Sequence, residues 1–329
     1  MNSFNSSKAK ILTTPKIGFA CMVLDQSGNK LFVEKTTTKT AYLKKTDNKH
    51  LESLVVNNLT SLQEKINYLS TLPTTQRMMR ISSGILPLFT LPETQNFYSG
   101  QIKKFIENMF ANIGITAKHN NIRLSSHPDQ FTVINNPDQK IYDNSLKELL
   151  YHTHMFECMS LSRNDGVAVN IHTGGKNNGT DGFVAGFETL PAHVKKLLTV
   201  ENCEFSFNVH DLIALKHHLP IVFDIHHHHI NTGEILRYDD PVFDHVIESW
   251  NGIRPKIHYS VEPEQLRDEI LSKRRPHASM PWCEFRNSVV LKYLKWADIM
   301  VELKNKNLAS QYLYNKYVTE QTRSTGDMN

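Results

Sequence analysis

Eight short apolar segments recur along the chain, and longer stretches with helical periodicity separate them. Each apolar segment has the length and composition of a buried strand. They occupy residues 16–22, 77–83, 121–127, 167–172, 197–202, 220–226, 255–260 and 298–303. Between them, apolar residues recur at three- and four-residue spacing over 51–69 and 101–113, which predicts helices with one buried face. Similar patterns occupy roughly 138–160, 182–198, 208–218, 240–250, 262–272 and 303–317.

This alternation of strands and helices predicts an α/β protein built as a single (β/α)8 TIM-type barrel. A doubly wound open sheet is the alternative, because spacing along the chain does not show that the sheet closes. The length of 329 residues suits one such barrel. We expect a mobile N-terminal tail at 1–15, the barrel at 16–317 and a polar C-terminal tail at 318–329.

The segment 25–50 interrupts the alternation with a long, aperiodic stretch that is rich in Lys and Thr. In a barrel it follows the first strand, at the end where active sites form. Long loops in compact domains are either disordered or functional. Two interpretations therefore stay open, a floppy insertion and a basic flap over a ligand.

Composition limits the class of protein. A hydrophobic fraction of 40% and a charged fraction of 21% are typical of a soluble globular domain with a large core. The net charge is 37 − 33 = +4, which permits a polyanionic partner without requiring one. The four cysteines form no CxxC pair, and neither a secretory signal nor a long apolar run is present. We therefore expect a soluble intracellular protein with no membrane partner.

Residue types that bind metals stand where the later strands end. They are His127, His172, Glu201, Asp224 with His227, Lys256 with His258, and Glu302. A single histidine near a strand end is usually structural, but the strands of a barrel all end at the face where active sites form. The coincidence at six strands therefore predicts a metal site at the carboxyl ends of the strands.

The mixture of imidazoles and carboxylates without thiolates suits Zn²⁺, Mn²⁺ or Fe²⁺. At least seven candidate ligands are too many for one tetrahedral ion, so we expect two or three divalent ions, with Glu201 and Glu302 placed to bridge them. Clustered divalent ions in a basic protein indicate phosphoester hydrolysis. The run of four histidines at 226–229 is explained in part, since Asp224 and His227 are three positions apart as the chain leaves the strand. His226, His228 and His229 stay unassigned.

Eight ordered blocks of sequence resemble the ultraviolet damage endonucleases, metal-dependent (β/α)8 enzymes related to endonuclease IV. The blocks are "IGFAC", "RISSGILPLF", "SSHPDQF", "NIHTGGK", "TVENCE", "FDIHHH", "KIHYS" and "VELKNK". The resemblance implies a DNA repair endonuclease that nicks the backbone 5′ of ultraviolet photoproducts and other distorting lesions in double-stranded DNA, acting as a monomer.

The resemblance also implies roles for particular residues. It implies three metal ions, usually manganese, held by His127, His172, Glu201, Asp224, His227, His258 and Glu302, with Glu201, Glu302, Lys256 and His277 as catalytic residues. Lys256 matches a lysine that can be carboxylated into a metal ligand, and a plain phosphate-binding lysine is the alternative. Phe19 and Gln130 match a pair of side chains that probe the DNA where the damaged bases leave the stack.

One position departs from the family pattern. Leu91 stands where the family carries a histidine before the proline, so a group that orients the attacking water is missing unless His226 or His228 replaces it. Arg274 and Arg275 could contact DNA phosphates. Further basic side chains that could do so are Lys103, Lys104, Lys195 and Lys196.

Three other functions remain possible. An abasic-site endonuclease of the endonuclease IV type would share the metal geometry. A lesion-binding protein that no longer cuts would agree with Leu91. A metal-dependent sugar isomerase would need a small closed pocket rather than a basic mouth.

Overall fold

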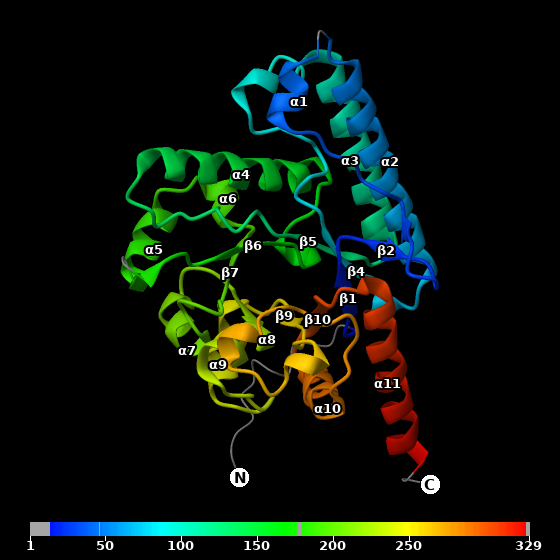
Figure 1. Cartoon of the computed structure of the whole chain (residues 1–329), viewed down its shortest axis with the longest axis vertical. Coiled ribbons are helices and arrows are strands. Elements are labelled where there is room, and N and C mark those ends of the chain that lie inside the picture. The colour runs from blue at the N-terminus through cyan, green and yellow to red at the C-terminus, as the bar shows by residue number, and fades with distance from the viewer. Residues whose placement is uncertain (1–13, 46, 177–178, 327–329) are drawn as a thin grey trace.

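The strands close into a barrel (Figure 1). The computed structural model describes residues 14–45, 47–176 and 179–326. Eight parallel strands form a closed barrel in the order β1-β10-β9-β8-β7-β6-β5-β4. Their bounds are β1 Ile17–Ala20, β4 Met78–Ile81, β5 Arg123–Ser126, β6 Ala168–His172, β7 Leu198–Glu201, β8 Ile221–Asp224, β9 Lys256–Tyr259 and β10 Asp298–Val301. Because β1 pairs with both β4 and β10, the barrel is closed. The predicted barrel with its eight strands is confirmed, and the open-sheet alternative is wrong.

Helices surround the barrel and connect its strands (Figure 1). They are α1 Lys39–Leu43, α2 Lys49–Thr71, α3 Gly100–His119, α4 Gln139–Cys158, α5 Gly179–Glu188, α6 Ala192–Lys195, α7 Val209–Leu212, α8 Ile225–Thr232, α9 Val242–Ser249, α10 Glu284–Lys292 and α11 Lys306–Gly326. The predicted apolar face of α2, which includes Leu51, Leu59 and Ile66, is buried. Within the described part of the chain, no helix is both long and apolar enough to cross a membrane.

Two of the predicted helices are interrupted or absent. The segment at 182–198 divides into α5 and α6 because Pro191 stands at the start of α6, where its missing N–H is tolerated. The segment at 262–272 contains only two short 3-10 turns, Glu264–Leu266 and Leu271–Lys273, in which no residue is buried. Without a buried face, tertiary packing does not stabilise a longer helix.

The histidine run and the C-terminal segment are helical instead. The predicted strand at 220–226 ends at Asp224, and α8 continues through all four histidines. α11 extends through residues 318–326, where we expected a polar tail. Most of the expected N-terminal tail, residues 1–13, lies outside the described residues.

Side chains alternate along each strand between the barrel axis and the layer of helices. Phe19 belongs to the main core that the barrel shares with the helices. Ala20 packs with Met78 and Met300 in a small separate cluster inside the barrel. His258 pairs in register with Met300, so its side chain also points to the axis, where it meets the other polar residues near the carboxyl ends.

A buried charge network closes the opposite end of the barrel. Asp298 accepts hydrogen bonds from the Arg123 guanidinium at 2.7 Å, from the Arg254 guanidinium at 2.8 Å and from the Lys16 backbone N–H at 2.8 Å. All four residues are buried. Polar residues at the amino-terminal face of a barrel stabilise the fold rather than act in catalysis.

The basic segment 25–50 is held against α2 by hydrogen bonds and an ion pair. It contains one strand of a two-stranded antiparallel hairpin, β2 Val23–Leu24 with β3 Lys30–Leu31, followed by α1. The buried Asn58 side chain bonds both the N–H and the C=O of Lys35, at 2.7 and 2.8 Å, and Lys65 pairs with Glu34. No described residue of this segment lines the central cavity, and a role as a flap over a bound ligand stays a prediction.

Candidate metal centre

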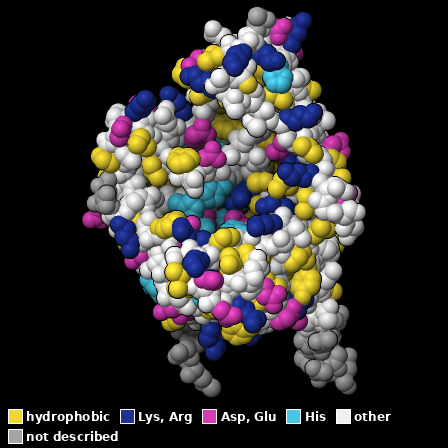
Figure 2. All heavy atoms as spheres, in the orientation of Figure 1, with side chains coloured by type: hydrophobic (Ala, Val, Ile, Leu, Met, Phe, Trp, Pro, Cys, Tyr) yellow, Lys and Arg dark blue, Asp and Glu magenta, His cyan; other side chains and the backbone are white. Residues whose placement is uncertain are grey.

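A cavity of about 810 Å³ opens at the carboxyl ends of the barrel strands. Figure 2 shows it as a hollow with histidine side chains at its base and Lys or Arg side chains near its rim. Among the predicted ligands, His127, His172, Glu201, His227 and Glu302 line this cavity. The cavity is open to the outside, as a large substrate would require and unlike the small closed pocket of a sugar isomerase.

Glu201 lies at the middle of the cluster. Its carboxylate oxygens lie 3.1 Å from His258 Nδ1, 3.2 Å from His227 Nδ1 and 3.4 Å from His127 Nε2. The side chain is 1% exposed, and the Asn170 amide, which faces the axis from β6, donates to one of its oxygens. Side chains from the ends of three other strands and from the start of α8 therefore meet at one carboxylate.

Glu302 extends the cluster toward β1 and β4. Its Oε1 lies 3.2 Å from His258 Nδ1, and the Arg80 guanidinium forms an ion pair with the same oxygen. Burial alone would raise the pKa of Glu302, but Arg80 and His258 outweigh burial and hold that pKa below its usual range. His258 thus stands between the two carboxylates that we expected to bridge ions.

Several buried ligand atoms in this centre have no hydrogen-bond partner. They are His172 Nδ1, Asp224 Oδ2, His258 Nε2 and Lys256 Nζ. Leaving such a group unsatisfied costs about 1–3 kcal/mol, which divalent ions among these atoms would offset. Burial lowers the pKa of His172 to about 3 and also lowers that of His258, so both rings are neutral at neutral pH, the form that binds metals. The donor set therefore fits divalent metal ions.

The carboxyl groups of the centre influence one another. Burial alone would raise the pKa of Glu201, but the charges that His258 and His172 carry when they are protonated in acid outweigh burial and hold that pKa well below its usual range. Burial raises the pKa of Asp224 well above its usual range, and the charges of Glu201 and Glu302 add to the shift. Crowded carboxylates cannot all ionise without counter-charge, and bound cations would allow every one of them to do so.

Asp224 sets the orientation of the histidine run. It is the N-cap of α8 and accepts a hydrogen bond of 2.7 Å from the His227 backbone N–H. The Asn202 side chain holds its backbone N–H and C=O at 2.8 and 2.9 Å. Residues three apart on a helix share a face, so the Asp224 and His227 side chains meet at the centre. Their Oδ2 and Nδ1 atoms are 3.7 Å apart.

The other three histidines of the run point elsewhere. His226 Nε2 lies 3.1 Å from the Arg275 carbonyl oxygen, and the Arg274 guanidinium donates to His229 Nε2 at 2.9 Å. His228 contacts Phe223, whose side chain faces the layer of helices. His228 therefore cannot take the place of the histidine that the family carries at the position of Leu91.

His277 lies beside the centre. Its ring is 6.4 Å from the His227 ring and 5.4 Å from the His226 ring. Its Nδ1 is 2.7 Å from the Glu302 carbonyl oxygen, so Nδ1 donates and Nε2 is left to accept a ligand. A backbone carbonyl that fixes the tautomer in this way is a common support for a metal-binding histidine.

The prediction that Phe19 probes DNA is wrong. Phe19 is 1% exposed and packs between the barrel and the helices, because its position in β1 points it away from the axis. Phe131, which we did not single out from the sequence, is an exposed aromatic residue beside Gln130. It is 79% exposed, directly follows Gln130, and lines the cavity with it. The sequence signal was available, since Phe131 ends the "SSHPDQF" block.

The two predicted phosphate-binding arginines differ. Arg274 forms an ion pair with the buried Glu262 and is only 14% exposed, so little of its guanidinium is open to a DNA phosphate. Arg275 is exposed, and its guanidinium lies 4.4 Å from the centre of the Phe205 ring at the rim of the cavity. Arg275 is thus available to an anion at the mouth.

Leu91 does not line the cavity. Its neighbours Thr90 and Pro92 line a separate cavity of about 550 Å³ between α4 and the loop after β4.

Arg80 is a residue of the central cavity that we did not predict from the sequence. It lines the central cavity and pairs with Glu302, and strand alternation places it on the axis side.

Buried imidazoles and carboxylates gather at the carboxyl ends of the strands of this TIM-type barrel. Enzymes of this class have their active sites at that end, and these ligands suit divalent ions. The chain belongs to the UV-endonuclease UvdE family, whose profile matches residues 15–324. The resemblance inferred from the sequence is therefore confirmed.

Relatives and solved structures agree with this assignment. A UV DNA damage endonuclease of Bacillus cereus strain G9842 is 31% identical over 243 residues, which cover 70% of this chain and 72% of that protein. One from Bacillus pumilus strain SAFR-032 is 34% identical over 192 residues, covering 56% and 58%. The crystal structure of SacUVDE superposes with a TM-score of 0.76 at 26% identity, over 94% of this chain and 99% of that chain. Endonuclease IV from Thermus thermophilus shares the fold, with a TM-score of 0.55 at 11% identity over 94% and 100%.

Proposed function

We propose that this protein is a metal-dependent DNA repair endonuclease that nicks the backbone 5′ of ultraviolet photoproducts and other distorting lesions. The observation that carries the proposal is the set of buried, unpartnered ligand atoms around Glu201 at the base of an open cavity. Membership of the UV-endonuclease UvdE family supports the reaction, and the name of the Bacillus cereus relative supports the lesion class.

The residues of the centre would hold two or three divalent ions, with Mn²⁺ expected and Zn²⁺ or Mg²⁺ as alternatives. The ligands would be His127, His172, Glu201, Asp224, His227, His258 and Glu302, with His277 beside them. When bound, such ions stabilise negative charge on the phosphodiester and lower the pKa of the attacking water.

The protein itself positions these groups. Asn170 donates to Glu201, and Arg80 holds one oxygen of Glu302, so both carboxylates keep fixed orientations. Arg80 also brings a permanent positive charge to the cavity wall, where it would attract a phosphate. Such preorganised charge acts without rearrangement when the phosphodiester is cleaved.

Lys256 fits a carboxylated ligand better than a free cation. Its side chain is 0% exposed, Nζ has no hydrogen-bond partner, and burial lowers the pKa of its amine to about 7. A neutral amine can react with carbon dioxide to give a carbamate, whose oxygens would add a ligand. Labelled bicarbonate and carbon NMR would detect the carbamate carbon in the wild-type protein and not in Lys256→Met.

The mouth would bind damaged duplex DNA. We propose that Phe131 and Gln130 enter the base stack where the damaged bases leave it, because an exposed aromatic ring fills such a gap without reading sequence. Phe205 and Arg275 form a second rim contact, suited to a base and a phosphate. Both contacts lie on one chain, and we therefore expect a monomer to act.

The deciding experiment compares cleavage of irradiated, abasic and undamaged duplexes by the Mn²⁺-loaded protein, with and without a chelator. We expect nicks 5′ of the photoproducts, loss of cutting with chelator and recovery with Mn²⁺. Cutting at abasic sites alone would indicate an endonuclease IV-type activity instead. Binding of irradiated duplex without any cutting, in the presence of Mn²⁺, would indicate a lesion-binding protein.

A further inference from the structure

His228 is a buried histidine whose ring is unsatisfied. Its side chain is 1% exposed, and neither ring nitrogen has a hydrogen-bond partner. A neutral imidazole carries one donor and one acceptor, and leaving either of them unpaired in the interior is unfavourable. The central metal centre does not use this ring, because His228 is turned about 100° around α8 from His227.

Two further ligand types face this ring from the outside of the barrel. Glu234 follows Gly233, which ends α8, and its Oε2 lies 3.7 Å from His228 Nε2. His210 stands on α7, and its Nε2 lies 4.0 Å from the same Glu234 oxygen. The His210 and His228 rings lie 5.6 Å apart, edge to face. One ligand atom from each residue lies within 4.8 Å of the other two.

We propose that His210, His228 and Glu234 bind one Zn²⁺ ion, at a site separate from the central metal centre. Two histidines and one glutamate are a known ligand set for zinc, with bond lengths of about 2.0–2.2 Å that place ligand atoms roughly 3.3 Å apart. The Glu234 oxygen is 3.7 Å from His228 Nε2 and 4.0 Å from His210 Nε2, so the ligand atoms would have to move closer together around an ion. His210 and Glu234 are 48% and 60% exposed, so their side chains can close around an ion while the buried His228 stays fixed.

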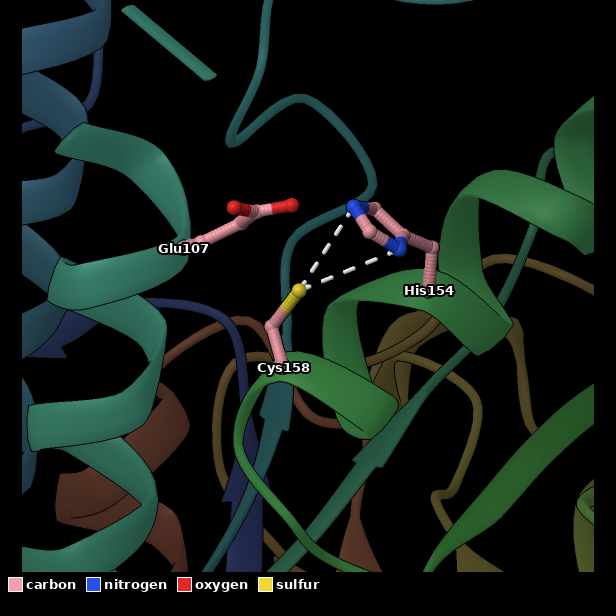
Figure 3. A group of neighbouring side chains, drawn as sticks. All are labelled: Glu107, His154 and Cys158. Carbon is pink, nitrogen blue, oxygen red and sulfur yellow. Dashed lines mark hydrogen bonds between the residues drawn. The ribbon is translucent and has the colours of Figure 1, made fainter. Parts of the chain in front are cut away.

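A second cluster of possible metal ligands lacks a buried ring such as that of His228. Glu107 on α3 approaches His154 and Cys158 on α4 (Figure 3), with Cys158 Sγ 3.5 Å from His154 Nε2. All three side chains are partly exposed, so water can satisfy them. Burial and the nearby Glu107 raise the pKa of the Cys158 thiol to about 11, and a protonated thiol is a poor ligand. This group therefore has no comparable need for an ion.

The position of the zinc site implies a structural role. α7 follows β7, which carries Glu201, and α8 carries His227, so an ion held by His210 and His228 ties together the two segments that supply these central ligands. Binding of an ion to the folded state alone stabilises that state. Zinc at this site is thus expected to raise the melting temperature without being part of the reaction.

The test uses full-length protein whose centre is loaded with Mn²⁺, dialysed against micromolar zinc chloride. The double variant His210→Ala with Glu234→Gln removes two ligands, both exposed, so the fold is preserved. We expect this variant to bind one zinc fewer per chain by elemental analysis, with affinity for that ion reduced on the order of 100-fold or more. The zinc-dependent rise in melting temperature should be smaller than in the wild type.

The matched control is His245→Ala with Glu248→Gln. This pair is also exposed, with His245 Nδ1 3.8 Å from Glu248 Oε2, but lacks a buried third ligand. The control should bind as much zinc as the wild type, and Cys158→Ser should do the same. Equal zinc binding by the double variant and the wild type would overturn the proposal, as would loss of the ion in either control. Because every protein here retains the central ligands, none of these outcomes depends on the proposed endonuclease activity.

Discussion

Replacing Phe131 with alanine is expected to weaken binding of damaged duplex while leaving the fold intact. Phe131 is 79% exposed, so roughly one-fifth of an aromatic surface of about 200 Å² is buried, and truncation costs about 1 kcal/mol of stability. Stacking of one aromatic ring on a base contributes about 1–3 kcal/mol to binding. Phe131→Ala should therefore weaken binding to irradiated duplex by roughly 5- to 150-fold.

The assay is a fluorescence titration of irradiated and undamaged duplexes, with chelator present to prevent cutting, and a thermal melt of each variant. Binding of undamaged duplex depends mainly on backbone charge and should change little. The matched control is Phe285→Ala, on α10, because Phe285 is 65% exposed and does not line the cavity. Phe19→Ala should instead lose about 3–5 kcal/mol of stability and keep the ratio of the two affinities. An unchanged affinity of Phe131→Ala for irradiated duplex, or an equal loss on both duplexes, would refute the assignment.

Three further changes test the metal centre. Glu201→Gln should fold normally but lose most nicking and part of its bound metal, because a buried charge between the ligands is removed; normal nicking with full metal content would contradict this. His227→Ala should lower the metal content by elemental analysis, whereas His229→Ala, whose ring contacts Arg274, should not; the reverse result would mean that the register of the run is wrong. Burial lowers the pKa of Lys256 to about 7 from 10.5, so between these values the unfolded state of the metal-free protein binds the extra proton and stability should rise with pH. Urea unfolding of Lys256→Met should show a flatter rise.

Local sequence patterns were sufficient to predict the strands and helices that bury one continuous apolar surface. The eight strands are apolar runs with charged or polar ends, and each of them forms within its predicted segment. The helix predicted at 262–272 is absent because neither of its two 3-10 turns has a buried residue, so no buried face stabilises a longer helix. The histidine run at 226–229 has no apolar periodicity, yet it is helical because the Asp224 carboxylate caps it and Gly233 ends it in a left-handed turn.

The sequence by itself determined which residue types stand at the strand ends and in what order, and these are enough to predict a barrel with a metal-binding mouth. Only the tertiary structure decided the direction in which each side chain points. Phe19 and Phe131 are both aromatic residues close to strand ends, but one is buried under the helices and the other is exposed at the mouth. His227 and His228 are neighbours, but one faces Glu201 and the other Glu234. Direction depends on strand register and helix rotation, which are set by packing between segments far apart in the chain, and no local pattern contains that information.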